Sequence, residues 1–272
     1  MFVRFTFVKN KMMCLDIVTK YFKMIEFLTL NFLLILITFF VAGFVKGVAG
    51  MGLPTIAMGI LSIIMSPLSA ASLLIIPSFV TNVWQLFTGP KFLDLIKRFW
   101  VMMVGIIIGT LAGSWLLTSI NTPYSSVGLG LALIIYSVHG LFGKAFSIPT
   151  RLESKLSPII GITTGLLNGA TGIFTLPAVP YIQALNLSKD DLIQALGLSF
   201  TVSTIALATG LANGGVFQMD NLLYSAIAII PALMGMWVGG IVRKRISIKT
   251  FRICFFIFIA MIGIEITLHP FI

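Results

Sequence analysis

The sequence predicts an all-α polytopic membrane protein. Hydrophobic residues make up 58% of its 272 residues, and charged residues only 10%. A typical soluble domain is about one quarter charged, so most of this chain is expected inside a bilayer. Two glycine- and proline-rich breaks also interrupt the apolar sequence at corresponding places. They indicate two homologous repeats of about four to five transmembrane elements each, with one broken segment in each repeat.

The chain is expected to divide into four parts. These are a basic leader at 1–26, a first membrane repeat at 27–142, a basic linker at 143–155 and a second membrane repeat at 156–272. A signal peptide is the alternative for the leader, but basic residues recur through Lys23 and no small-residue cleavage site follows the next apolar run. We therefore expect the leader on the cytoplasmic side.

The first repeat begins with a span over 28–45, which carries no charge until Lys46. After a glycine break, the apolar piece 53–65 ends at Ser66-Pro67. At about 13 residues this piece is too short to cross a bilayer unaided, so it suits a re-entrant segment. Three full spans are expected next, over 68–87, over 99–117 and from the turn at 119–124 to Phe142.

The second repeat follows the same order. A broken span over 156–171 and a short piece over 173–185 come first, and full spans follow over 193–211, 222–242 and 253–268. Basic residues gather in short loops at 89–98, 143–155 and 243–252, which is the pattern of cytoplasmic loops under the positive-inside rule. When these basic loops are placed in the cytoplasm, the chain is expected to cross the membrane about eight to ten times. The side of the membrane on which the C-terminus lies is not determined by this count.

The net charge of +10 does not indicate a nucleic-acid partner, because the bases lie between spans and form no face interleaved with aromatic residues. The two cysteines, Cys14 and Cys254, lie far apart and predict neither a disulfide framework nor a metal site. The sequence has no Walker-type loop, and no cofactor is predicted. The expected partners are a small anionic solute and membrane lipid, and the oligomeric state stays open.

The two breaks share one pattern. Gly43–Pro54 and Gly165–Pro177 both read G-x-x-x-G-x-x-G followed by a proline. Lipid cannot satisfy the backbone N–H and C=O groups that such a break exposes, so it persists only where protein buries it or where water and a solute fill it. Matched breaks in two halves point to the binding site of a transporter. We expect the breaks to meet near the membrane midplane as two walls of one solute site.

The chain from residue 28 to 268 resembles the sulfite exporter TauE/SafE family in these breaks and in the size and spacing of its spans. Members of that family are small permeases with two homologous halves. The resemblance implies transport of a small organosulfur or sulfur-oxo anion, such as sulfite, sulfoacetate or thiosulfate, across a bacterial inner membrane. In the second break, Ile173, Phe174 and Thr175 stand where the family commonly has more glycines. This departure leaves the particular anion open.

Lys46 is the charged residue that lies within the apolar crossing regions of the first half. A lysine at the centre of a bilayer costs about 3 kcal/mol on insertion scales, so its side chain should face protein or water. One interpretation is a counter-charge for an anion, assisted by N–H groups of the break and a helix N-terminus. The other is a lysine that snorkels to the membrane interface.

Other polar residues surround the breaks. Asn168 occupies the position that matches Lys46 and can donate from a neutral amide. The hydroxyl of Thr171 could face the solute or bond to its own helix, and Asn82 could line the path or join helices. The predicted substrate-binding residues are Lys46, Gly47, Gly50, Gly52, Asn82, Asn168, Gly169, Thr171 and Gly172. No catalytic residue and no metal ligand is predicted.

Glycines outside the breaks are expected to serve helix packing. Gly105, Gly109 and Gly113 lie four residues apart, as do Gly235 and Gly239. This small-xxx-small spacing lets two helix backbones approach closely. Two further polar residues, His139 and Glu265, lie near span ends and are expected at the interface.

Together these features favour a secondary transporter for a small anion. A membrane-embedded enzyme acting on a lipid or isoprenoid substrate is the alternative, and it would normally show clusters of carboxylates, histidines or arginines in its loops. This chain has two histidines and scattered acids. A non-transporting assembly subunit is a third class, but it leaves the matched breaks unexplained.

Overall fold

The computed structural model describes residues 30, 32–119, 122–143, 147–215, 219–243 and 245–269. The chain divides into two compact units, Met1–Ile37 and Thr38–Ile272. The predicted leader at 1–26 lies outside the described residues. The second unit holds every contact and cavity of the candidate site.

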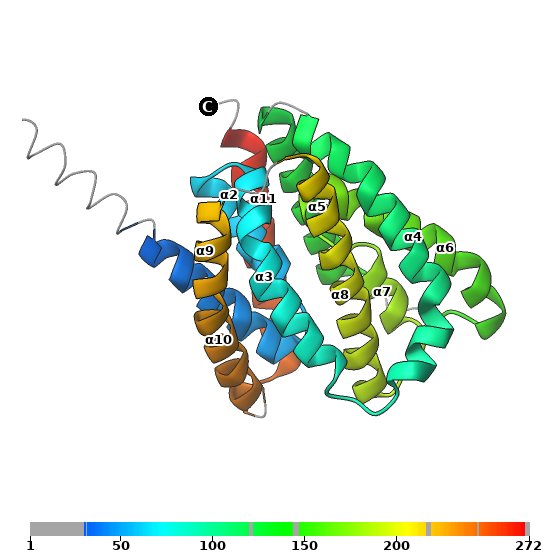
Figure 1. The fold of residues 1–272 in the computed structure, drawn as a ribbon. Helices are drawn as coiled ribbons and strands as arrows, with labels where there is room; N and C mark the ends of the chain where they lie inside the picture. Colours follow the sequence, from blue (N-terminus) through cyan, green and yellow to red (C-terminus); the bar gives the residue numbers. More distant parts are fainter. Residues whose placement is uncertain are drawn as a thin grey trace, which may run out of the picture. The chain divides into compact units, whose positions relative to one another are not determined.

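The described residues form helices and no strands (Figure 1). The elements are the N-terminal helix Phe32–Ala49, α2 (Leu53–Ile64), α3 (Pro67–Leu86), α4 (Phe92–Ser119), α5 (Thr122–Phe142), α6 (Thr150–Thr171), α7 (Ala178–Gln183), α8 (Lys189–Asn213), α9 (Met219–Ile227), α10 (Ile229–Val242) and α11 (Ile248–Leu268). In the described part of the chain, 7 helical stretches are long and apolar enough to cross a membrane. The prediction of an all-α polytopic membrane protein is confirmed.

The element bounds differ from the predicted ones where charges or prolines intervene. α4 begins at Phe92, before the predicted start at 99, because its first turns carry charged side chains beyond the apolar span. The short piece predicted at 173–185 is helical only over Ala178–Gln183. The span predicted at 222–242 is interrupted at Ala228, since Pro231 has no N–H to donate to the preceding turn. α6 is 22 residues long but is not among the 7 apolar stretches.

A proline in α3 is compensated by a side chain from the second half of the chain. Pro77 has no N–H to donate to the carbonyl of Leu73, and a bilayer offers no water in its place. The hydroxyl of Ser225 on α9 donates to that carbonyl at 2.7 Å, and it accepts from the N–H of Ile76 at 3.3 Å. This bridge fixes α9 against the middle of α3.

The helices α4 and α6 touch through glycine backbones. A Cβ atom added at Gly109 would lie 2.3 Å from the carbonyl oxygen of Ile162, and one added at Gly165 would lie 2.3 Å from that of Ile106. Gly105, Gly113, Gly161 and Gly169 face backbone in the same way. The numbers of the contacting residues increase together along α4 and α6, so the two helices run parallel.

The N-terminal helix and α10 form a second pair of this kind. A Cβ atom added at Gly43 or Gly47 would lie 2.1 or 2.2 Å from a carbonyl oxygen of α10. Gly235 and Gly239 face the carbonyls of the N-terminal helix at 2.0 and 2.2 Å. These two helices also run parallel, because the contacting residue numbers again rise together. The packing role predicted for the glycines outside the breaks is confirmed.

The two pairs correspond contact by contact, and each joins the helix before a glycine break in one half to a helix of the other half. Gly43 with Ala232 corresponds to Gly165 with Ile106, and Gly47 with Met236 corresponds to Gly169 with Thr110. The offset between matching residues is constant for each helix. The organisation into two repeats, with the bounds given above, stays a prediction that this correspondence favours.

The basic loops lie at one end of the second unit, which we call the basic end. The ends of α3 and α10 and the start of α8 line one cavity there, through Thr88, Arg243 and Ile193. α4 and α6 also begin at the basic end, since Arg98 pairs with Glu153. The two glycine pairs therefore run in opposite directions (Figure 1). α11 runs away from the basic end, so the C-terminal end of this helix lies at the opposite end.

Substituting Gly165 tests the backbone contact between α4 and α6. We expect Gly165→Ala to lower the free energy of unfolding by about 1–3 kcal/mol, because its methyl group forces the helices apart. Gly128→Ala is the control, since a Cβ atom there meets nothing within 4 Å. It should raise stability by about 0.5–1 kcal/mol through helix propensity. Equal unfolding of both variants in detergent micelles would contradict the contact.

Candidate functional site

Lys46 lies at the end of the N-terminal helix, and its side chain is 3% exposed. The Nζ atom donates to Oγ1 of Thr81 at 3.1 Å and also to Oδ1 of Asn82. Both partners belong to α3. The ammonium group therefore points into the protein and not toward a membrane interface.

Asn82 connects the two halves of the chain. Its Nδ2 atom donates to Oγ1 of Thr204 on α8 at 3.2 Å, while its Oδ1 atom accepts from Lys46. The Thr204 hydroxyl donates in turn to the carbonyl of Phe200. Asn82 was predicted to line the solute path; its side chain joins α3 to α8 beside the buried lysine and does not line the cavity described below.

Asn168 makes the matching contacts in the second half. Its Nδ2 atom donates to Oγ1 of Thr110 at 3.1 Å and to the backbone carbonyl of Ser203 at 2.9 Å. Its Oδ1 atom is buried and accepts no hydrogen bond from the residues that the structure describes. The central polar cluster is the set Lys46, Thr81, Asn82, Thr110, Asn168, Ser203 and Thr204, and it contains residues from both halves of the chain.

No described carboxylate pairs with Lys46. The described ion pairs are Lys91 with Asp191 and Arg98 with Glu153, and both lie toward the basic end. A buried ammonium that has only neutral hydrogen-bond acceptors retains most of its desolvation cost. An anion beside Lys46 would offset that cost.

At the glycine breaks, three glycines have positive φ angles, a backbone conformation that other residues rarely adopt. Gly50, Gly52 and Gly172 have φ angles of 75°, 103° and 73°. The N–H of Gly50 bonds to the carbonyl of Lys46, and that of Gly172 to the carbonyl of Asn168, each at 2.7 Å. Both broken helices therefore end in a left-handed glycine cap, one turn after the matched polar residue.

The two breaks differ in how open they are. A Cβ atom added at Gly50 would have its nearest contact at 3.9 Å, whereas one added at Gly172 would meet Cε and Sδ of Met58 at 2.9 and 3.0 Å. Gly169 packs against the carbonyl of Thr110, and the Thr171 hydroxyl donates to the carbonyl of Leu167 in its own helix. The side of the second break is thus occupied by protein.

A cavity of about 510 Å³ adjoins the first break, and we call it the lysine cavity. Its walls come from the N-terminal helix, α3, the start of α8 and α10. It is lined by Lys46, Gly47, Gly50, Trp84, Gln85, Thr88, Ile193, Leu233, Met236, Trp237, Gly240, Ile241 and Arg243. The cavity therefore has an inner polar end at Lys46 and Gln85, apolar walls, and a cationic residue at the basic end.

Other predicted site residues lie outside this cavity. Gly52 lies against the side chains of Val45 and Phe255, which do not line the lysine cavity. Asn82 lies behind Lys46, and Asn168, Gly169, Thr171 and Gly172 do not line the lysine cavity. The binding roles of these residues stay predictions.

Gln85 ties the first break to two other elements. Its Nε2 atom donates to the carbonyl of Gly50 and to the carbonyl of Ile193, both at 2.9 Å. Gln85 lies three residues after Asn82 on α3, and its bond to the break was not predicted from the sequence. Sequence reasoning also missed Arg243, although this residue is the first base after an apolar span. In both cases the polar residue could be seen in the sequence, but its contact depends on how helices far apart in the chain pack together.

Comparisons with known proteins give one result. The model of the protein family described as sulfite exporter TauE/SafE matches residues 35–266. No curated protein and no solved structure matches the chain.

Replacing Gln85 tests its role at the break. In Gln85→Leu the carbonyls of Gly50 and Ile193 lose their common donor. We expect the free energy of unfolding to fall by about 1–3 kcal/mol, the usual cost of a buried group left unsatisfied. Gln183→Leu, at an exposed glutamine, should change stability by less than about 0.5 kcal/mol. Denaturant unfolding in micelles measures both, and an unchanged midpoint for Gln85→Leu would contradict the role.

Proposed function

The chain belongs to the sulfite exporter TauE/SafE family, and we propose that it is a secondary transporter for a small sulfur-containing anion. The proposed substrate is a sulfur-oxo or organosulfur anion such as sulfite, sulfoacetate or thiosulfate. The proposed location is the bacterial inner membrane, with the basic end in the cytoplasm, as the positive-inside rule favours. Members of this family are membrane transporters and not enzymes.

The observation that carries the proposal is a buried lysine, at the inner end of a cavity, that pairs with no carboxylate among the described residues. An ammonium group in a water-poor interior attracts an anion more strongly than it would in water. Thr81 and Asn82 hold the Nζ atom on one side and orient it. In this proposal the third ammonium proton binds the anion in the lysine cavity.

The first break supplies a second source of positive potential. α2 is a helix of 12 residues that begins directly after Gly52, and no side chain caps its N-terminus. The unpaired N–H groups of a helix N-terminus favour an anion. Because Gly50 has open space where a side chain would stand, an anion can approach this backbone closely.

The lining of the lysine cavity supports a path from the basic end to Lys46. Arg243 lies where α10 ends, and Gln85 and Thr88 line the α3 side. Trp84 of α3 and Trp237 of α10 also line the cavity and are 64% and 71% exposed. A rim of positive charge raises the local concentration of anions. The apolar walls suit an anion that carries an organic group.

Removing the charge of Lys46 tests the proposal. We expect Lys46→Met to lower kcat/KM for anion uptake about 10–100-fold, since a hydrogen bond to a charged group contributes about 1.5–3 kcal/mol. Uptake of labelled thiosulfate, sulfite and sulfoacetate into proteoliposomes is the measurement. Lys155→Met is the control, because Lys155 is exposed on α6 and far from the lysine cavity lining. Parental uptake by a well-folded Lys46→Met protein would refute the role of this residue.

Alanine at each break separates binding from packing. Gly50→Ala strains a left-handed backbone by about 1–2 kcal/mol but meets no neighbour closely, so uptake should fall more than stability does. Gly172→Ala adds a contact of 3.0 Å with Met58, so uptake and stability should fall together. The measurements are uptake and thermal unfolding of both variants. If Gly50→Ala lost uptake only in step with stability, the break would have no binding role.

A further inference from the structure

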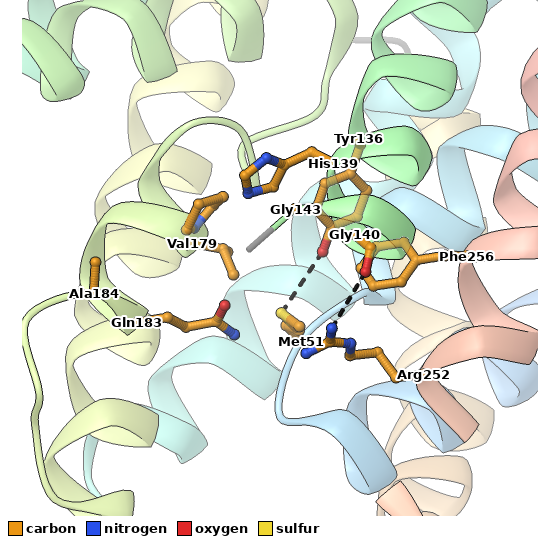
Figure 2. A pocket seen from close by; sticks show the side chains of 11 residues that line it. Met51, Tyr136, His139, Gly140, Gly143, Val179, Gln183, Ala184, Arg252 and Phe256 are labelled. Carbon is orange, nitrogen blue, oxygen red and sulfur yellow. Dashed lines mark hydrogen bonds between the residues drawn. The ribbon is translucent and has the colours of Figure 1, made fainter. Parts of the chain in front are cut away.

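A second cavity lies on the other side of the first break (Figure 2). It has a volume of about 150 Å³, room for about five water molecules at roughly 30 Å³ each. Met51 of the break, the end of α5, α7 and the start of α11 form its walls. The proposed function does not use this cavity.

Three side chains with N–H donors converge on this cavity from three helices. Figure 2 shows Arg252 of α11, Gln183 of α7 and His139 of α5 around the same space. Nη2 of Arg252 donates to the carbonyl of Gly140 at 3.4 Å, which is long for a hydrogen bond. A guanidinium group has five N–H donors, so most of them stay available. Within the described part of the chain, no carboxylate lines the cavity or pairs with Arg252.

We propose that this space, the arginine cavity, is a second binding site for a small oxyanion. The proposal rests on the proposed function, because the ligand is an anion of the transported class. The planar fork of Arg252 binds two oxygen atoms of the anion, a geometry that a lysine cannot offer. The amide of Gln183 and the imidazole of His139 donate to the remaining oxygen.

The two cavities meet at neighbouring residues of the break. Gly50 lines the lysine cavity, and Met51 lines the arginine cavity. The hydroxyl of Tyr136 donates to Sδ of Met51 at 3.6 Å and holds that side chain between them (Figure 2). The arginine cavity lies about one turn from the basic end, since Arg252 is in the first turns of α11. Anions captured there reach a high local concentration beside the break.

Calorimetric titration of the purified full-length chain with thiosulfate, in chloride-free detergent buffer, tests the proposal. The parent protein should bind two anions, and Lys46→Met should bind one. Adding Arg252→Gln to Lys46→Met should weaken the remaining site at least 10-fold. Gln183→Leu should weaken the same site and provides a second variant if Arg252→Gln folds poorly. Arg245→Gln is the matched control, because Arg245 is exposed in the same basic loop and lines neither cavity.

The outcomes distinguish this proposal from the proposed function. If one anion binds and Lys46→Met abolishes that binding, the second site is refuted and the transport role of Lys46 stands. If Arg252→Gln and Gln183→Leu both leave affinity and stoichiometry unchanged, the second site is refuted as well. If Lys46→Met keeps full uptake while Arg252→Gln loses anion binding, the arginine cavity stands and the role of Lys46 fails.

Discussion

Close backbone contact at glycines is the interaction on which the rest of this structure depends. Between helices in a bilayer, apolar side chains gain little by leaving lipid, so association relies on packing and hydrogen bonds. Gly43 and Gly47 bring the N-terminal helix against α10, and Gly165 and Gly169 bring α6 against α4. With the N-terminal helix fixed against α10, Lys46 lies on the side of α3, whereas Asn168 contacts both α8 and α4, the helix against which α6 packs.

The second constraint is that every backbone group opened by a glycine or proline needs a partner in the absence of water. Gln85 supplies a donor to the carbonyl of Gly50, and Ser225 supplies one to the carbonyl beside Pro77. Each donor comes from a helix other than the one it serves. These hydrogen bonds restrict the positions of α2, α3 and α9 more than apolar packing alone would. In a membrane, an unpaired backbone carbonyl costs more free energy than the loss of one apolar contact.

The two halves match in backbone but differ in charge and access. The position of Lys46 holds an asparagine in the second half, and the open side of Gly50 is filled by Met58 at Gly172. Positive charge is thus concentrated at the first break, which has the lysine cavity on one side and the arginine cavity on the other. The two matched breaks are therefore not equivalent in charge. The second half contributes neutral donors and the helices against which the first break packs.

The sequence by itself determined what depends on neighbours along the chain. Hydropathy identified the apolar spans, and the glycines predicted breaks at Gly43–Pro54 and Gly165–Pro177, within which Gly50 and Gly172 have the left-handed conformation, a local property of the chain. The pattern around the breaks also carried the family resemblance that the family match confirms. Only the tertiary structure decided which side chains meet, since these contacts depend on the register of helices distant in sequence. It buried Lys46 against Thr81 and Asn82, bound the Thr171 hydroxyl to its own helix, and covered Gly172 with Met58. It also brought Arg252 to a cavity beside Met51, a neighbourhood that packing creates and that no spacing in the sequence encodes.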